Sequence, residues 1–429
     1  MQILIKGARV LDPGKMDAYK SILINGPTIA AVLDPSDSVP GGDAGLEVVD
    51  AQGLVVVPGL MDIHVHLREP GHEYKETIAT GAAAAARGGF TSVCAMPNTD
   101  PVNDNAQVTT FVLEKARVAK GARVYPVGAV TKGSAGTHLA EIRDMQQAGI
   151  VAVSDDGRPV ESAQLMRRAL EYCNGLSMPV FVHAEDLSLV NGGAMNEGPA
   201  ATFWGIPGIP SAAEAVMVAR DILLSRLTGA HVHFCHISCE ESIDLIRNAK
   251  LKGIRVTCET APHYFTLTDE DVKGYDTHFK MNPPLRSEND RQAVIQGLVD
   301  GTIDVIASDH APHSKEEKDL EFDRAAFGIV GLETALALSL KLVQNQQLSL
   351  EDLILKMAKH PARILGINND IIPGNPADLT LVDLEEKWVI DPEQFVSKSR
   401  NTPFTGMPVQ GKAVAAMVDG VFVFKGRHA

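Results

Sequence analysis

The central part of the chain alternates short apolar runs with stretches long enough to form a helix, and it does so eight times. The runs are Gly59–His66, Thr91–Pro97, Arg123–Val130, Ile150–Ser154, Val180–His183, His231–His236, Ile254–Thr257 and Val305–Asp309. Apolar runs of this length between helix-length segments are typical of parallel strands joined by helices. Eight such units make a (β/α)8 barrel of the TIM type, so the pattern predicts an α/β fold of this kind.

Both ends of the chain carry short strand-like runs separated by Gly and Pro, such as ILIKGARVL near the start and VFVFKG near the end. Two sets of terminal strands around a long middle predict one small β domain built from residues 1–57 and 368–429. The barrel is then expected over 58–367. A chain of 429 residues is long enough for both parts.

Charge and composition exclude several classes of function. The formal net charge is −15 and no basic run stands out, which argues against nucleic acid and anionic membrane as partners. No apolar stretch approaches the length of a membrane span. The five cysteines are widely spread and form no CxxC pair. We therefore expect a reduced, cytoplasmic protein.

Residues of metal-binding type stand where several of the apolar runs end. His64 and His66 are two apart, so on a strand they share a face and can hold one ion together. The others are His183, His236, Asp309 and the adjacent pair Asp155 and Asp156. A lone histidine is more often a hydrogen-bonded core or surface residue, and Asp309 alone could be a helix N-cap. Because barrel strands gather their carboxyl ends at one face, the set predicts a two-zinc site.

A second cluster, around Cys235, has some features of a zinc finger. It contains His231, His233, Cys235, His236 and Cys239. Alternate residues of a strand point to opposite faces, and no second ligand pair follows at short spacing. We expect only His236 to reach the site and the cysteines to be small core residues.

The motifs DIHVHLREPG at 62–71 and ASDHAPH at 307–313 resemble the two signature motifs of the dihydroorotases, members of the amidohydrolase superfamily. The resemblance covers most of the chain, including MPNTDP at 96–101, NPPLR at 282–286 and FGIVGLET at 327–334, and is closest to the longer bacterial, type I group. It implies a zinc-dependent barrel that reversibly closes N-carbamoyl-L-aspartate to L-dihydroorotate and water in pyrimidine (UMP) biosynthesis.

The resemblance also implies the zinc ligands. His64 and His66 match one pair and His183 and His236 the other, with Asp309 as both ligand and catalytic residue. Many superfamily members bridge the two ions with a carbamylated lysine, but this chain has no lysine between Lys132 and Lys250. A carboxylate must bridge instead, and the type I pattern matches Asp156. Asp155 remains an alternative bridging residue, because adjacent residues on a strand point to opposite faces and the sequence does not show which one points inward.

The ligand types imply how such a site works. Two zinc ions lower the pKa of a shared water, so that hydroxide exists near neutral pH, and one of them polarises the ring carbonyl. Asp309 is expected to move the proton between that water and the departing ring nitrogen. No further cofactor is expected.

The resemblance assigns the substrate contacts to His66, Arg68, Asn98, Asn282, His313, Phe327 and Gly328. Arg68, Asn98 and His313 match positions that bind the ring carboxylate, which calls for a bidentate arginine. Asn282, Phe327 and Gly328 match positions that hold the pyrimidine ring, largely through backbone groups. The alternative for Arg68 is a surface ion pair with Glu69 or Glu73.

Other interpretations stay open at this point. A related cyclic-amide hydrolase of the allantoinase or dihydropyrimidinase type fits the same scaffold, and so does a silent or partner-dependent subunit. A homodimer and an association with aspartate transcarbamoylase are also open. The polar segment 314–325 is either a mobile lid over the substrate or a solvated surface loop.

Overall fold

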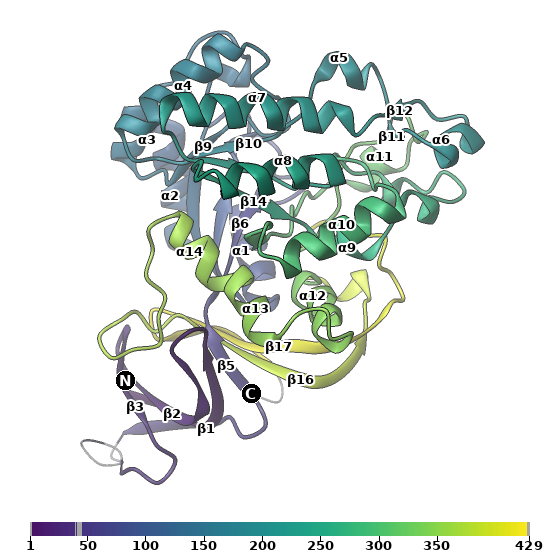
Figure 1. Cartoon of the computed structure of the whole chain (residues 1–429). Helices are drawn as coiled ribbons and strands as arrows, with labels where there is room; N and C mark the ends of the chain where they lie inside the picture. The colour runs from purple at the N-terminus through teal and green to yellow at the C-terminus, as the bar shows by residue number, and fades with distance from the viewer. Residues whose placement is uncertain (1, 39, 41–44, 427–429) are drawn as a thin grey trace.

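The computed structural model describes residues 2–38, 40 and 45–426. Figure 1 shows a helix-covered barrel packed on a smaller sheet that contains both ends of the described chain. The remaining residues of the predicted β domain, 1, 39, 41–44 and 427–429, lie outside this description. Within the described residues, no helix combines the length and the apolar character that crossing a membrane requires.

Eight parallel strands form the barrel, in the order β15-β14-β13-β10-β9-β8-β7-β6. They are β6 (Leu60–Val65), β7 (Phe90–Ala95), β8 (Arg123–Gly128), β9 (Ala152–Ser154), β10 (Val180–Val182), β13 (Val232–Phe234), β14 (Val256–Thr260) and β15 (Val305–Ile306). The sheet closes just beyond β15, where the His66 N–H donates to the His310 carbonyl at 2.9 Å. The predicted eight-stranded barrel is confirmed. The seventh strand runs later than expected, because Glu259 and Thr260 pair with Val305 and Ile306.

Helices follow the strands and cover the outside of the barrel (Figure 1). They are α1 (Ile78–Arg87), α2 (Ala106–Val118), α3 (Ile142–Ala148), α4 (Ala163–Gly175), α5 (Leu187–Val190), α6 (Pro199–Trp204), α7 (Ala212–Thr228), α8 (Glu240–Leu251), α9 (Pro262–Thr266), α10 (Glu288–Val299), α11 (Lys315–Lys318), α12 (Ala335–Gln344), α13 (Leu350–Ile354) and α14 (His360–Ile364). Local sequence explains α1, whose alanines favour a helix and whose first turn is capped by Thr77 and Thr80.

Short elements connect the longer ones. They are the strand pair β11 (Met195–Asn196) and β12 (Gly208–Ile209), the 3₁₀ turns η1 (Lys132–Ser134), η2 (Asp269–Asp271), η3 (Thr277–Phe279) and η5 (Pro392–Gln394), and the π-helical turn η4 (Leu355–Lys359).

The second sheet joins the two ends of the chain, in the order β18-β17-β16-β5-β1-β2-β3, with β4 paired to β1. Its strands are β1 (Gln2–Asp12), β2 (Met16–Asn25), β3 (Thr28–Leu33), β4 (Leu46–Asp50), β5 (Val55–Pro58), β16 (Leu379–Val389), β17 (Pro408–Val418) and β18 (Val421–Lys425). β5 connects the ends, because it pairs with β1 on one side and β16 on the other. The predicted composite β domain is therefore confirmed.

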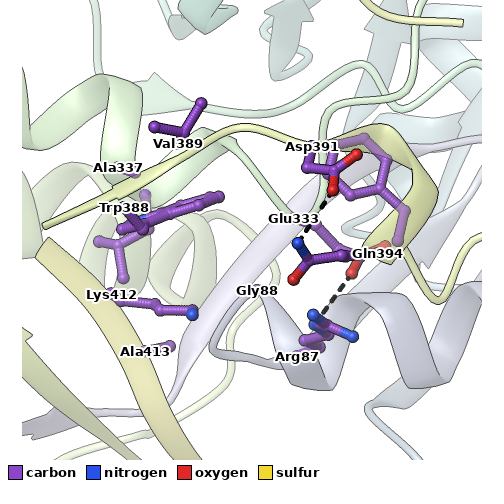
Figure 2. Close-up of a pocket in the computed structure, with 12 residues that line it drawn as sticks. Arg87, Gly88, Glu333, Ala337, Trp388, Val389, Asp391, Gln394, Lys412 and Ala413 are labelled. Atoms are coloured by element: carbon purple, nitrogen blue, oxygen red, sulfur yellow. Dashed lines mark hydrogen bonds and ion pairs between the residues drawn. The ribbon is translucent and has the colours of Figure 1, made fainter. Parts of the chain in front are cut away.

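The barrel and the sheet meet along α1, α12, β16 and β17. Figure 2 shows a small pocket at this junction, of about 40 Å³, beside the ion pair of Arg87 and Glu333. The Glu333 side chain is buried, and its Oε1 accepts the N–H groups of Val396 and Ser397 at 2.8 and 3.1 Å.

Candidate metal and substrate site

The predicted metal ligands meet at the carboxyl end of the barrel. His64 lies in β6, and the other five follow the ends of their strands: His66, Asp156, His183, His236 and Asp309. All six are buried. His236 and Asp309 have φ angles of 36° and 48°, in the left-handed region that non-glycine residues seldom adopt. Such backbone strain concentrates at functional sites, where it aims a side chain.

Asp156 lies at the centre of the four imidazoles. Its Oδ1 is 3.4 Å from His64 Nε2, 3.4 Å from His236 Nε2 and 3.6 Å from His183 Nδ1. Its Oδ2 is 3.5 Å from His66 Nε2. This carboxylate therefore faces four ligand atoms from three different strands, which is the position of a bridging group.

Asp309 lies close to His64 and His66, the two histidines at the end of β6. Its Oδ1 is 3.3 Å from His66 Nε2 and 3.5 Å from His64 Nε2. Burial alone would raise the pKa of Asp309, but the imidazoles of His64, His66 and His236 hold it well below its usual range. The carboxylate is thus ionised.

Asp155 points away from this cluster. Its Oδ1 accepts the N–H groups of Val130 and Thr131 at 2.8 and 3.1 Å, and its Oδ2 accepts the hydroxyl of Thr131. These three hydrogen bonds hold the turn after β8. Of the two adjacent aspartates, only Asp156 lies among the imidazoles.

The cluster suits a metal ion. His64 Nε2 and Asp156 Oδ1 are buried and have no hydrogen-bond partner, although they face each other. Burial would raise the pKa of Asp156, but His64, His183 and His236 lower it well below its usual range. Imidazole nitrogens and carboxylate oxygens are ligands that zinc accepts, and a cation among them would satisfy both unpaired atoms.

A chain of hydrogen bonds orients His64. Glu259 Oε1 lies 2.6 Å from His64 Nδ1, and Glu259 Oε2 lies 3.1 Å from His233 Nε2. Thr257 Oγ1 lies 2.8 Å from His233 Nδ1 and 2.8 Å from His231 Nε2. Carboxylate-bound imidazoles are common around metals, because the carboxylate fixes which nitrogen carries the proton.

The donor of each hydrogen bond between His64 and His231 can be assigned. A carboxylate only accepts, so His64 Nδ1 and His233 Nε2 both donate to Glu259. In a neutral His233, Nδ1 then accepts from the Thr257 hydroxyl, which in turn accepts from His231 Nε2. The assignment leaves the lone pair of His64 Nε2 directed at Asp156, as a metal ligand requires.

Other side chains support the remaining ligands. Asn98 Oδ1 lies 2.8 Å from His66 Nδ1, and Glu185 Oε2 lies 3.1 Å from His183 Nε2. His263, in α9, is buried near the cluster with an unpaired Nε2. Burial lowers the pKa of His263 to about 4, so it is neutral at pH 7.

The sequence prediction missed Glu259 and His263. Both belong to the stretch Glu259-Thr260-Ala261-Pro262-His263, where β14 passes into α9. Ending the seventh strand at Thr257 left that strand without a histidine or a carboxylate at its tip. Glu259 and His263 could therefore have been found from the sequence, but only if the seventh strand had been ended at Thr260.

A third group of ligand-type atoms combines His64, Cys235 and Glu259. His64 Nδ1 already donates to Glu259, and burial raises the pKa of the Cys235 thiol well above its usual range. A thiolate is therefore disfavoured there. All five cysteines are buried and free, as predicted.

Arg68 is buried beside the cluster without an acidic partner. Its φ angle is 63°, its Nε donates to the Pro312 carbonyl at 3.2 Å, and its Nη2 lies 3.5 Å from His313 Nε2. No carboxylate of the described residues lies within 4.0 Å of its guanidinium. The suggested ion pairs do not form, because Glu69 pairs with Lys115 and Glu73 accepts the Gly71 N–H.

The remaining predicted substrate contacts lie on neighbouring loops. Asn282 Nδ2 donates to Glu185 at 3.0 Å, while its Oδ1 is buried and unpaired. The Phe327 carbonyl accepts from His313 Nε2 at 2.8 Å. The Gly328 N–H donates to the Lys280 carbonyl at 3.0 Å, so this N–H is already used within the protein.

The segment 314–325 contains α11 and is attached at its buried Lys318. The Lys318 Nζ donates to the carbonyls of Lys280, Ala326 and Gly328 at 3.2, 2.7 and 3.1 Å. Lys75 also pairs with Glu317 at 2.7 Å. A lid motion of this segment stays a prediction, and it would have to break these contacts.

Comparison with known proteins places the chain in a family. Residues 53–242 match the family model described as dihydro-orotase-like. A dihydroorotase from Desulforapulum autotrophicum is 61% identical over 99% of both chains. The chain belongs to the dihydroorotase family. A second member, from Geobacter metallireducens, is 52% identical over 99% of this chain and 100% of the relative.

Solved structures with the same fold are related cyclic-amide hydrolases. An L-hydantoinase (dihydropyrimidinase) from Arthrobacter aurescens has a TM-score of 0.89 and 27% identity, and the match covers 99% of this chain and 96% of that one. A dihydropyrimidinase from Brevibacillus agri NCHU1002 matches with a TM-score of 0.85 at 23% identity, which shows the fold alone, over 100% of this chain and 96% of that one. The dihydroorotase family and these hydrolases thus share one architecture.

Proposed function

We propose that this chain is an active dihydroorotase that interconverts N-carbamoyl-L-aspartate and L-dihydroorotate. The observation that carries the proposal is the position of Arg68. A guanidinium that is buried without a carboxylate partner is costly, unless a bound anion completes the pair. The ring carboxylate of dihydroorotate is such an anion, and the hydantoin and dihydrouracil rings lack one.

Two zinc ions per chain are the cofactor that the ligand set supports. His64 and His66 would hold one ion, His183 and His236 the other, and Asp156 would bridge them, with Asp309 completing the first site. When bound, zinc supplies Lewis acidity and makes hydroxide available from water near neutral pH.

Asp309 is the residue that moves the proton. Its oxygen reaches the two histidines of the first site, so it lies beside the reacting atoms. In ring opening it takes a proton from the attacking water and gives it to the departing ring nitrogen. In ring closure it performs the same steps in reverse.

The substrate is oriented by the groups around Arg68. The guanidinium binds the carboxylate in the bidentate manner that arginine favours, and Asn98 and His313 complete that contact. Asn98 uses its oxygen on His66, so its amide N–H₂ remains for the substrate. Asn282 and the Phe327 carbonyl would hold the ring, and the Gly328 N–H would do so after releasing the Lys280 carbonyl.

The experiment is one purified preparation in which zinc per chain is measured and turnover is followed on L-dihydroorotate, allantoin and dihydrouracil. Turnover of dihydroorotate alone, with up to two zinc ions per chain, supports the proposal. Turnover of allantoin or dihydrouracil instead would assign a neighbouring hydrolase specificity. Zinc without turnover on all three would indicate a silent or partner-dependent subunit.

The same preparation tests the assembly. A homodimer and a complex with aspartate transcarbamoylase are both compatible with the family. Sedimentation of the chain alone, and after addition of aspartate transcarbamoylase, separates a monomer, a dimer and a mixed complex. Activity that appears only in the mixed complex would make the partner part of the enzyme.

A further inference from the structure

A second pocket lies at the opposite end of the barrel from the metal ligands. It has a volume of about 230 Å³ and is lined at the amino ends of β10, β13 and β14 and by α4 and α14. A water takes about 30 Å³ in the liquid, so a group of several non-hydrogen atoms fits. Catalysis in barrels of this type uses the other face, so this pocket has no part in the reaction proposed above.

The pocket is lined by groups that bind anions. Arg255 and Arg363 both reach it, and no carboxylate of the described residues lies within 4.0 Å of either guanidinium. Arg255 Nη1 donates to the Gly229 carbonyl at 3.0 Å and to Asn174 Oδ1 at 3.4 Å, which leaves Nε and Nη2 to bind a ligand. His231 and Asn174 complete the polar lining.

The carboxylate that acts on His231 does not neutralise this charge. Asp304 acts on His231 from a distance, but its carboxylate is paired with Lys250 at 2.6 Å. Burial lowers the pKa of His231 to about 4, and the charge of Arg255 acts in the same direction. The pocket is therefore electropositive and its histidine neutral at pH 7.

His231 connects this pocket to the metal site. It is the first residue of the hydrogen-bond chain that continues through Thr257, His233 and Glu259 to His64. Each step is between 2.6 and 3.1 Å, and the donors are assigned without a gap. A ligand that moves the His231 ring would change the partner of Thr257, and through it the support of a metal ligand.

We propose that the pocket lined by Arg255, Arg363 and His231 is an effector site for a phosphate group, free or esterified, and that its occupancy alters turnover through the chain to His64. Two guanidinium groups match the charge of a phosphate near neutral pH, and arginine binds phosphate oxygens in pairs. The coupling rests on the proposed function, whereas the binding does not.

Binding is tested by calorimetry with inorganic phosphate and, separately, with a nucleoside monophosphate. We expect the double variant Arg255→Gln/Arg363→Gln to bind at least ten-fold more weakly than wild type. Arg143→Gln, on the exposed surface of α3, is the matched control and should bind as wild type does. Tighter binding of the nucleotide would identify an ester, and tighter binding of phosphate the free anion. Equal binding by all variants, or none at millimolar phosphate, would overturn the site.

Coupling is tested by the ratio of kcat with and without the bound anion. The ratio should differ from one in wild type and return to one in Thr257→Val, which keeps the shape of the side chain but breaks the chain of hydrogen bonds. Thr257→Val should still bind phosphate. A ratio of one in wild type at saturating anion would refute the coupling, and an unchanged response in Arg255→Gln/Arg363→Gln would place the effect elsewhere. Because calorimetry needs no turnover, the binding result can be interpreted even if the dihydroorotase assignment fails.

Discussion

Glu259 and Asp156 contact the two nitrogens of the same imidazole, that of His64, at 2.6 Å from Nδ1 and 3.4 Å from Nε2. Replacing Glu259 by Gln would leave one of its two histidines facing an N–H₂ group rather than an acceptor. Loss of such support typically lowers metal affinity by about 10- to 100-fold. We expect this loss of zinc affinity in Glu259→Gln, measured by competition with a chelator. The exposed Glu270→Gln is the control, and equal affinities would contradict the role assigned to Glu259.

Asp156 and Asp155 are adjacent but should respond differently to removal. Asp156→Ala should reduce bound zinc, because it deletes the carboxylate among the four imidazoles. Asp155→Ala should keep zinc and lose stability, on the order of 3 kcal/mol, since Val130 and Thr131 lose a charged acceptor. Metal analysis and urea unfolding separate the two effects. Full zinc in Asp156→Ala together with lost zinc in Asp155→Ala would reverse the assignment.

Arg68→Gln should retain zinc and lose turnover of dihydroorotate. Removing one partner of a buried charged pair costs about 2 to 5 kcal/mol, equivalent to a fall in kcat/KM of about 30- to 5,000-fold. Steady-state kinetics and zinc content of the same sample measure both. Arg143→Gln, on the exposed surface of α3, is the control and should keep wild-type kinetics. Wild-type kcat/KM in the variant would remove Arg68 from the site.

Glu333, at the junction between barrel and sheet, should make stability depend on pH. Burial is the main cause that raises its pKa from 4.5 to about 7, against the opposing effects of the Ser397 N–H and Arg87. Between these pH values the folded chain keeps a proton that the unfolded chain loses. The contribution of Glu333 to the free energy of unfolding is therefore fully present below about pH 4.5 and is lost as the pH rises through about 7.

The measurement for Glu333 is the urea midpoint of wild type and Glu333→Gln at pH 5, 6, 7 and 8. The difference between them should shift in favour of the variant as the pH rises, because glutamine does not ionise. Other titrating groups cancel in this difference. A difference that does not change with pH would show that Glu333 stays ionised throughout.

The sequence determined the architecture and most of the candidate ligands. The alternation of apolar runs and helix-length segments predicted the eight barrel strands, and Gly and Pro marked the ends of the terminal strands that form one sheet. The strand ends then located His64, His183, His236 and Asp309, because parallel strands bring their carboxyl ends to one face. Resemblance to the dihydroorotases added Arg68 and named the reaction, which spacing alone did not provide.

Only the tertiary structure decided which way side chains point and what they meet. Asp155 and Asp156 are indistinguishable by position, and the contacts with Thr131 on one side and the histidines on the other separate them. The left-handed backbone at Arg68 keeps its guanidinium away from Glu69, its neighbour in sequence. Glu259 reaches His64 across 195 positions of the chain. Such contacts depend on how distant strands close into a barrel, and no local pattern in a single sequence encodes that closure.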